Sequence, residues 1–463
     1  MQERTEMTQL AEEKQTYLSN FSHVEKQITS GDGRAPWLDA LRRAGMERFA
    51  AVGFPTTKQE EWRFTNVAPI ARVPFKPARA VEVSYDDIAH YSFRAEAACE
   101  IVFVNGHFSP ALSSLRAMPR GVRVSSLASA LQADADLIGK YLGKHADLLK
   151  NPFVALNTGF IADGAFIHIA RGSTIETPIH LLFVSAPSKE PAVAHPRVLA
   201  VVEDRVSATI VESYVGKGRD GQYFTNAVTE IVTGNDCNID HCKLQQESLD
   251  AFHVASMNVE LGRSTNFVSH AATIGAKLSR NDLACVLDGD GAYATLNGLV
   301  VLSGEQHCDN NTLLRHEKPN CPSHELYKHV LNDLASGVFK GKIFVQKDAQ
   351  KTNAKQASKS LLLSDDAVMN SMPALEIYAD DVKCTHGSTI GPVDEDMVFY
   401  LRTRGVGYEA ARHLLTYAFA ADVTRRIRVE PVRRRLEDFL ASQHGLPQDL
   451  RISDLGAHDE AVV

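Results

Sequence analysis

The hydrophobic period of the sequence changes near residue 101, and this change limits the folds open to the chain. From about Ile101 to Asp381, apolar residues alternate with polar ones over short segments, and Gly, Asn and Asp recur between the segments. Over residues 255–261, for example, Ala, Met, Val and Leu alternate with Ser, Asn and Glu. Alternation of this kind buries one face of a strand and exposes the other. The central part of the chain is therefore predicted to be β-structure.

The turn signals narrow the choice of β-architecture. Between residues 254 and 304 the strand-like pieces are separated by glycines, at Gly262, Gly275, Gly289, Gly291, Gly298 and Gly304. Frequent short strands without long helices between them are typical of a sandwich, a barrel or a β-solenoid. The pattern favours the solenoid, but the turns are uneven and no clean repeat emerges, so the sandwich stays open. A helical insertion is expected near residues 133–150.

Helical patterns flank the β-region and divide the chain into parts. Residues 1–95 are predicted to form an N-terminal helical domain, with apolar residues at roughly helical spacing before a Gly and Pro break at 53–55. The β-core is assigned to residues 96–386. A C-terminal helical domain follows over residues 387–445, and residues 446–463 form a tail.

The C-terminal region predicts three helices. Asp394 can cap the first, whose acidic first turn suits the helix dipole, and Gly405 ends it. An apolar stripe over residues 411–418 marks the second. The third begins at Pro431, a favourable first-turn residue, and carries apolar residues on one face over 432–440.

Charge and cysteine content limit the partners and the compartment. Among 463 residues, 49 Lys and Arg stand against 57 Asp and Glu, and this net charge of −8 offers no general attraction to nucleic acid or to an anionic membrane. No apolar stretch is long enough to span a bilayer, and no signal-peptide pattern is present. The seven cysteines are an odd number and are widely spread, unlike a disulfide framework. We expect a cytoplasmic protein with free thiols that binds neither nucleic acid nor membrane.

The motifs of common enzymes are missing from the sequence. The run GVFKGK, residues 337–342, has the wrong spacing for a Walker A loop and is followed by Ile343 rather than Ser or Thr. No GxGxxG opening a helix, GxSxG elbow or HExxH pair occurs. The chain is therefore not expected to hydrolyse ATP by itself or to be an enzyme.

Residues that could ligate soft metals are concentrated late in the chain. Six of them lie within one stretch: His307, Cys308, His316, Cys321, His324 and His329. Their spacing is irregular and no CxxC occurs, so they are expected to be structural or surface residues rather than a preformed zinc site.

Cys384 and His386 are a better candidate for a metal site. Residues two apart in an extended strand share a face, which places the thiol beside the imidazole. Two ligands do not complete a tetrahedral site, so another chain, a substrate or water would have to supply the rest. A structural role for the pair stays open.

Five segments are specific enough to compare with known families. They are GFPTTKQEEWRFTN (53–66), FVNGHFSPALS (103–113), ALNTGFIADGAFIHI (155–169), GKIFVQKDAQKTNAKQASKSLLLS (341–364) and LEIYADDVKCTHGSTIGPVDEDMVFYLRTRGV (375–406). They resemble the family of SufB and SufD proteins, which act in iron–sulfur cluster assembly. The last segment looks like the signature of that family, and the resemblance extends over most of the chain.

The resemblance implies a fold and a branch of the family. It implies a central right-handed parallel β-helix between two α-helical domains, and so decides the solenoid over the sandwich. SufB-type chains carry a key cysteine in the segment that corresponds to residues 356–362, where this chain has QASKSLL, with Ser358 and no cysteine. They typically have glutamate after the histidine, where this chain has Gly387. Both departures favour the SufD type.

The resemblance also implies a scaffold function. A SufB-like subunit would pair with the β-helix, and a SufC-like ATPase would bind the C-terminal helices. Cys384 and His386 match positions placed at the interface with SufB, where iron or a nascent cluster would be held transiently and completed by the partner chain. No cofactor is expected to stay bound to the isolated chain.

Residues of the first C-terminal helix are the expected contact for the ATPase. An apolar anchor flanked by charge suits a protein interface. The predicted contact residues are Met397, Tyr400, Leu401, Arg404 and Gly405, with Arg402 on the rim.

Two alternatives of other classes were considered. A stand-alone β-helix enzyme acting on polysaccharide would line its groove with aromatic residues, but the two Trp, Trp37 and Trp62, are both N-terminal. A plain metal carrier would use the cluster between His307 and His329. Degradation of acidic polysaccharide with calcium would identify the first, and metal analysis with Cys and His substitutions would identify the second.

Overall fold

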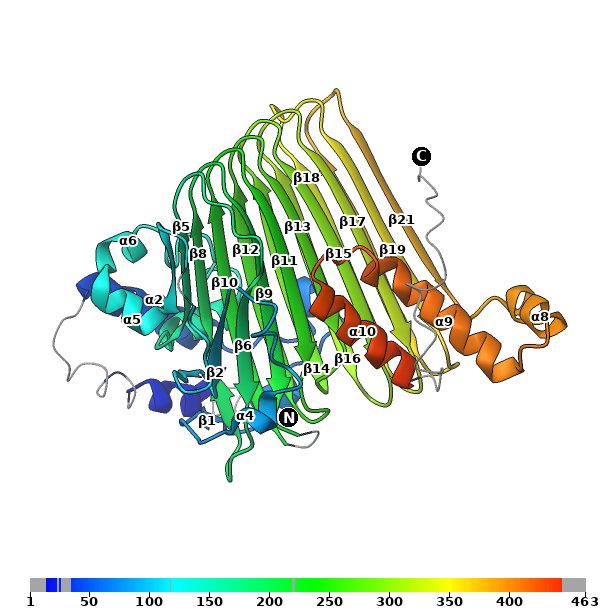
Figure 1. Cartoon of the computed structure of the whole chain (residues 1–463), viewed down its shortest axis with the longest axis horizontal. Helices are drawn as coiled ribbons and strands as arrows, with labels where there is room; N and C mark the ends of the chain where they lie inside the picture. The colour runs from blue at the N-terminus through cyan, green and yellow to red at the C-terminus, as the bar shows by residue number, and fades with distance from the viewer. Residues whose placement is uncertain (1–13, 23–24, 26–34, 117, 219–220, 444–463) are drawn as a thin grey trace.

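A long parallel β-solenoid with helices at both ends forms the body of the protein (Figure 1). The computed structural model describes residues 14–22, 25, 35–116, 118–218 and 221–443. Within these residues, two sheets of eleven and ten strands form the two long faces of the solenoid. The predicted mostly β fold with a central solenoid is confirmed, and the sandwich alternative is excluded because neighbouring strands of each sheet are parallel, apart from two antiparallel pairs near the start of the chain.

From residue 197 onward, successive strands alternate between the two sheets. The first sheet contains β4 (Val122–Ser126), β5 (Gly164–Ile169), β8 (Arg197–Val202), β10 (Tyr223–Thr233), β12 (Phe252–Leu261), β14 (Leu278–Leu287), β16 (His307–His316), β18 (Ser336–Val345) and β20 (Val368–Ile377), with β1 (Lys76–Pro77) and β7 (Ala192–Ala194) at its side. The second contains β3 (His107–Phe108), β2 (Cys99–Val104), β6 (Ile179–Ser185), β9 (Ser207–Gly216), β11 (Asn238–Gln246), β13 (Asn266–Thr273), β15 (Tyr293–Leu302), β17 (Pro322–Leu331), β19 (Asn353–Leu362) and β21 (Lys383–Gly391).

Strand register stacks the inward-facing side chains into columns. Phe267, Ala294 and Ser323 occupy one column, although 27 residues separate the first two and 29 separate the last two. The strands keep a similar length while the turns vary, which explains why no clean sequence repeat emerges. The turns also stack tightly: a Cβ on Gly262 would lie 2.3 Å from the carbonyl oxygen of Gly234, so only glycine fits there.

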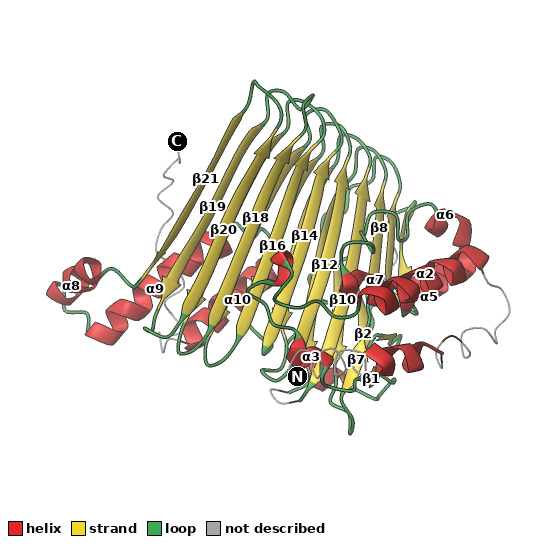
Figure 2. Cartoon of the chain, turned by 180° about the vertical axis from the view of Figure 1, so that it is seen from behind, coloured by secondary structure: helices red, strands yellow, loops and turns green. Residues whose placement is uncertain are grey.

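The N-terminal segment packs on the solenoid instead of forming a separate domain. Its one long helix in the described residues, α2 (Pro36–Val52), is followed by the short elements η1 (Glu60–Trp62), α3 (Ala68–Ala71) and α4 (Tyr85–Ile88). Seen from behind in Figure 2, α2 and α3 lie against the sheet that contains β10 and β12. Trp62 and Phe75 share a buried cluster with Phe224 and Phe252 of that sheet. The N-terminal region, predicted as a helical domain over residues 1–95, therefore buries this apolar surface against strands of the solenoid.

The insertion predicted near residues 133–150 is broader and less helical than expected. Helices α5 (Leu127–Ala133) and α6 (Ala135–Gly139) open it, turns occupy most of residues 140–151, and α7 (Pro152–Gly159) closes it. Asp134 ends α5 with an extended φ of −154° and caps α6 by accepting a hydrogen bond from the backbone N–H of Leu137. Asp134 therefore separates α6 from α5, which lies before the predicted bounds.

Three helices follow the solenoid: α8 (Glu395–Thr403), α9 (Tyr408–Thr424) and α10 (Glu430–Gln443). Asp394 caps α8 through hydrogen bonds from the backbone N–H groups of Asp396 and Met397, as expected. Helices α9 and α10 lie across the sheet that contains β15 and β17, whereas α8 projects beyond the last strand (Figure 1). The predicted tail, residues 446–463, lies outside the described residues.

Candidate functional site

The last two strands leave one end of the solenoid open. Strands β20 and β21 are the final strands of their sheets, and among the described residues each pairs with a neighbour on one side only. Large apolar side chains are exposed here, with Val368 at 50% and Ile390 at 46%. An edge of nine or ten residues without a partner strand is unusual, because unpaired backbone groups invite pairing with another chain.

Cys384 and His386 lie on β21, at this open end. In the strand register, Cys384 lies opposite Ala354 and His386 lies opposite Gln356, and both of those residues are buried in the solenoid interior. The two predicted residues therefore share the inward-facing side of the last strand. No further turn covers them in the described residues, so His386 is exposed and Cys384 is half-buried.

Cys384 is the most accessible of the seven thiols. The other six are buried, and all seven are free. Burial raises the pKa of the Cys384 thiol, partly offset by a hydrogen bond from the backbone of Ala354. A raised pKa disfavours the thiolate that ligates metals, so a nearby cation would be needed to hold the ionised form. Beside the pair, the Ser388 hydroxyl donates a hydrogen bond of 2.9 Å to Ser371 of β20.

Helix α8 presents an exposed apolar surface that the sequence located only in part. Met397 and Tyr400 are 48% and 53% exposed, and Phe399, which the sequence analysis did not single out, is 66% exposed. Phe399 was missed because the prediction followed the stripe of residues spaced for packing on one helix face. Its position between Met397 and Tyr400 in the same helix was the available signal.

The other residues predicted to contact an ATPase have different surroundings. Leu401 is half-buried against Val398 and Ala411, so its side chain supports the helix. The Arg404 guanidinium donates a hydrogen bond of 3.3 Å to the Tyr400 hydroxyl and lies 5.2 Å from its ring centroid. Gly405 adopts a left-handed φ of +91° that ends the helix.

The cysteines and histidines between residues 307 and 329 are not brought together. The His307 ring bonds Ser336 at 2.7 Å and Thr65 at 3.0 Å on the outer face, Cys308 and His329 lie in the interior, and His324 is exposed on the opposite sheet. In the part of the chain that the structure describes, no group of three or more His, Cys, Asp and Glu could hold a metal ion. This cluster therefore does not form a preformed site for a metal carrier.

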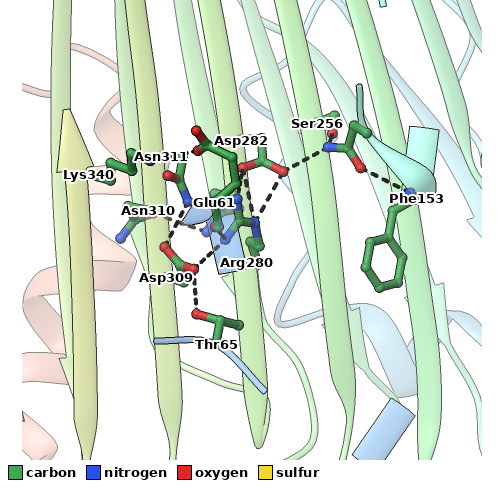
Figure 3. A network of polar contacts seen from close by, with 12 residues as sticks. Glu61, Thr65, Phe153, Ser256, Arg280, Asp282, Asp309, Asn310, Asn311 and Lys340 are labelled. Atoms are coloured by element: carbon green, nitrogen blue, oxygen red, sulfur yellow. Dashed lines mark hydrogen bonds and ion pairs between the residues drawn. The ribbon is translucent and has the colours of Figure 1, made fainter. Parts of the chain in front are cut away.

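A polar network on the outer face of the first sheet fixes the N-terminal segment (Figure 3). Arg280 of β14 donates hydrogen bonds to the Glu61 carbonyl at 2.9 Å and to Asp309 at 2.5 Å, and it stacks 3.7 Å from the Trp62 ring centroid. Thr65 donates a hydrogen bond to the same Asp309 carboxylate. Burial lowers the pKa of Arg280, but the nearby carboxylates outweigh it and raise the pKa overall.

This network is an anchor rather than a catalytic centre. Asn151 joins it to the insertion by donating to Asp282 at 2.9 Å and to Ser256 at 3.1 Å. Lys340 of β18, two strands from β14, pairs with Glu61 at 2.9 Å. Because its groups bond one another, the network leaves no ligand position that needs filling. The Trp62 ring is used in this stacking and is not available to a sugar.

No helix in the described ranges is apolar over a length that would cross a membrane.

Comparison with known proteins gives matches over the length of the chain. Residues 183–419 match the family model described as the SUF system FeS cluster assembly SufBD core domain, and residues 11–181 match the SufBD protein N-terminal region. An iron–sulfur cluster assembly SufBD family protein of Synechocystis is 32% identical over 85% of this chain and 88% of its own length. The SufD proteins of Escherichia coli and Bacillus subtilis are 29% and 27% identical, over 84% and 91% of this chain and 89% and 96% of their own lengths.

Proposed function

This chain belongs to the SufBD family of iron–sulfur cluster assembly proteins, and on that premise we propose that it is a SufD-type scaffold subunit. It pairs with a SufB-like β-solenoid and holds a SufC-like ATPase, in the cytoplasm. It is a non-catalytic subunit, and iron or a nascent cluster is its transient cargo. The sequences and names of the E. coli and B. subtilis relatives support this branch of the family.

The observation that carries the proposal is the open end of the solenoid. Strands β20 and β21 offer backbone groups along their free edges, and exposed Val368 and Ile390 offer apolar area beside them. A second solenoid can add its own strands there, because main-chain hydrogen bonds give affinity and side-chain pockets give specificity. A homologous partner suits such an edge, since its last strands would have a similar length.

Cys384 and His386 form the part of the cargo site that this chain supplies. They share the inward-facing side of β21 and are too few to close a metal site alone. A partner at the open end would bring further ligands to the same face. Cys384→Ala and His386→Ala should reduce cluster assembly in the reconstituted complex and leave the isolated subunit folded. Loss of thermal stability with normal assembly would make the pair structural.

Helix α8 is the proposed docking element for the ATPase. It projects from the body, so a partner can reach it without disturbing the solenoid (Figure 1). Met397, Phe399 and Tyr400 give an exposed apolar centre, and Arg404 lies at its edge. Replacement of Met397, Phe399 and Tyr400 by Ala together should abolish ATPase binding and leave pairing of the solenoids intact, because these side chains are exposed and do not belong to α9 and α10, which cover the sheet.

Co-purification of the tagged full chain from its native host tests the whole proposal. Recovery with a homologous solenoid chain and a Walker-type ATPase is the expected result. Recovery as a lone monomer at physiological salt would overturn the scaffold function.

A further inference from the structure

A cavity of about 1140 Å³ lies where the C-terminal helices cross the second sheet (Figure 1). The sheet lines it with the outward-facing side chains of Gln246 on β11, Val301 on β15 and Val330 on β17. Helices α9 and α10 form the facing wall, and residues 90–93 contribute to the lining. Cavities that hold small organic ligands measure about 300–1,000 Å³, so a molecule of that size fits here. Among the described residues, none of β21 or α8 lines the cavity, so it is separate from the open end and from the proposed docking element.

Arg435 of α10 brings a guanidinium without a carboxylate partner into this lining. Its carbon Cζ lies 4.8 Å from the Tyr91 ring centroid and 5.6 Å from that of Phe93, and its Nη1 is buried with no hydrogen-bond partner among the described residues. Stacking fixes the plane of the group but uses none of its five N–H donors. Burial lowers the pKa of Arg435 to about 10, so the group keeps its charge at neutral pH. A half-buried cation of this kind is costly unless an anion pairs with it.

The other two arginines of the lining already have partners. The Arg412 guanidinium donates a hydrogen bond of 3.1 Å to the Leu363 carbonyl, and that of Arg434 lies 3.7 Å from the Glu430 carboxylate. Arg435 is therefore the arginine of this cavity that is available to a bound anion.

The carboxylates of the lining limit the charge of that anion. Glu96, Glu409 and Asp438 are exposed at the rim, while Glu247 is buried and pairs with His253 at 2.7 Å. Rim carboxylates repel an incoming anion in proportion to its charge, and a phosphate carries close to two negative charges at neutral pH. A ligand with one negative charge, such as a carboxylate, is favoured.

The remaining walls select the body of the ligand. Ile274, Val301, Val330 and Phe439 give the cavity an apolar surface on both the sheet and the helix side. The Gln246 amide adds a polar group, since its oxygen is buried and has no hydrogen-bond partner among the described residues. An amide offers both donors and an acceptor, so it can bond a polar group of the same ligand. The lining therefore suits an apolar molecule with one charged end.

We propose that this cavity binds a monocarboxylate with an apolar body, whose carboxylate pairs with Arg435. A guanidinium can donate two parallel hydrogen bonds to the two carboxylate oxygens, which is the strong form of this pair. The body of the ligand packs against Val301 and Val330 on the sheet and against Phe439 on α10. Such a ligand joins the C-terminal helices to the solenoid, so its binding stabilises the folded chain. The inference does not rest on the proposed function, because the full chain alone contains every residue of the site.

Calorimetric titration of the full chain with three probes tests the chemistry of the site. The probes are 4-phenylbutyrate, the neutral 4-phenylbutyramide and inorganic phosphate. We expect 4-phenylbutyrate to bind with a Kd of about 1 mM or lower and to raise the melting temperature, and the other two to bind at least about tenfold more weakly. Absence of 4-phenylbutyrate binding would overturn the site, and equal binding of the amide or of phosphate would overturn the assignment of a monocarboxylate.

Arg435→Met and its neighbour Arg434→Met locate the binding. Loss of a hydrogen-bonded charge pair should weaken binding of 4-phenylbutyrate to Arg435→Met about tenfold to 100-fold. Arg434→Met should bind as the unsubstituted chain does, because that arginine lies at the exposed rim and pairs with Glu430. Without the probe, Arg435→Met should melt no lower than the unsubstituted chain, since methionine keeps an apolar stem over Tyr91 and removes the unpaired cation. A lower melting temperature with unchanged binding would make Arg435 a packing residue and overturn the proposal.

Labelling of the unsubstituted chain with phenylglyoxal, which modifies arginines, gives a measurement that needs no variant. Bound 4-phenylbutyrate should slow modification of Arg435, followed by mass spectrometry, at least threefold. Arg171 is the control, because it is exposed, pairs with Asp204 and is not part of the cavity lining. Equal rates for Arg435 with and without saturating probe would show that the probe binds elsewhere and would overturn the proposal.

Discussion

Phe399→Ala is expected to weaken binding of the ATPase by about 100-fold. A phenylalanine buries roughly 200 Å² when fully covered, and Phe399 is 66% exposed, so a partner over α8 would cover about 130 Å² of this side chain. At about 25 cal/mol per Å², loss of that area costs about 3 kcal/mol, which is within the range of interface hot spots. Each 1.4 kcal/mol corresponds to about tenfold in Kd.

Titration calorimetry of the full chain with the ATPase from the same host measures this change. Leu149→Ala is the matched control, because Leu149 is 64% exposed but lies in the insertion, far along the chain from α8. Neither substitution should move the melting temperature, since both side chains are mostly in solvent. A Kd for Phe399→Ala within threefold of the unsubstituted chain would refute α8 as the docking element.

Three further outcomes follow from the same contacts. Arg280→Ala, which leaves buried carboxylates without their cation, should lower the free energy of unfolding in urea by about 3–5 kcal/mol, whereas Arg171→Ala, which breaks an exposed pair, should cost less than about 1 kcal/mol. Because Glu325 holds its proton in the fold, its contribution to stability is present below pH 4.5 and is lost as pH rises through about 7. As pH rises between those values, the free energy of unfolding of Glu325→Gln should therefore gain about 3 kcal/mol relative to that of the unsubstituted chain, as measured by urea unfolding at each pH. An equal change of the unfolding free energy with pH in both chains would contradict this. Cys384 should react with iodoacetamide before the other six thiols in the folded chain, and a SufB-like partner should slow that reaction; equal rates with and without the partner would oppose an interface position.

Period and spacing alone were enough to predict the strands and the shared face of the candidate pair. Side chains alternate across any strand, so Cys384 and His386 had to lie on one face once that segment was extended. Which face it was depended on the register with Ala354 and Gln356, 30 residues earlier in the chain. Turn lengths set that register, and the sequence carries no simple signal for them.

The anchor around Arg280 was beyond sequence reasoning for a similar reason. Its partners Glu61 and Asp309 are 219 and 29 residues away along the chain. An arginine in a strand of alternating polar and apolar residues is expected to face solvent. Arg280 is buried only because the N-terminal segment covers it. The sequence showed Trp62 only as part of a segment that resembles the family, whereas the structure packs its ring against this guanidinium.

The open end and the polar interior have one physical cause. A solenoid buries each inward-facing residue because the next turn covers it, so the residues of a last turn are left with half of their neighbours. In the middle of the solenoid Leu296 fills the interior, but toward β21 glutamate, glutamine and histidine take the successive positions of its column. Apolar residues there would promote aggregation of the free subunit through its uncovered end. Polar ones can face water in the free subunit and exchange it for a partner's ligands, so the polar residues of this column keep the candidate site accessible.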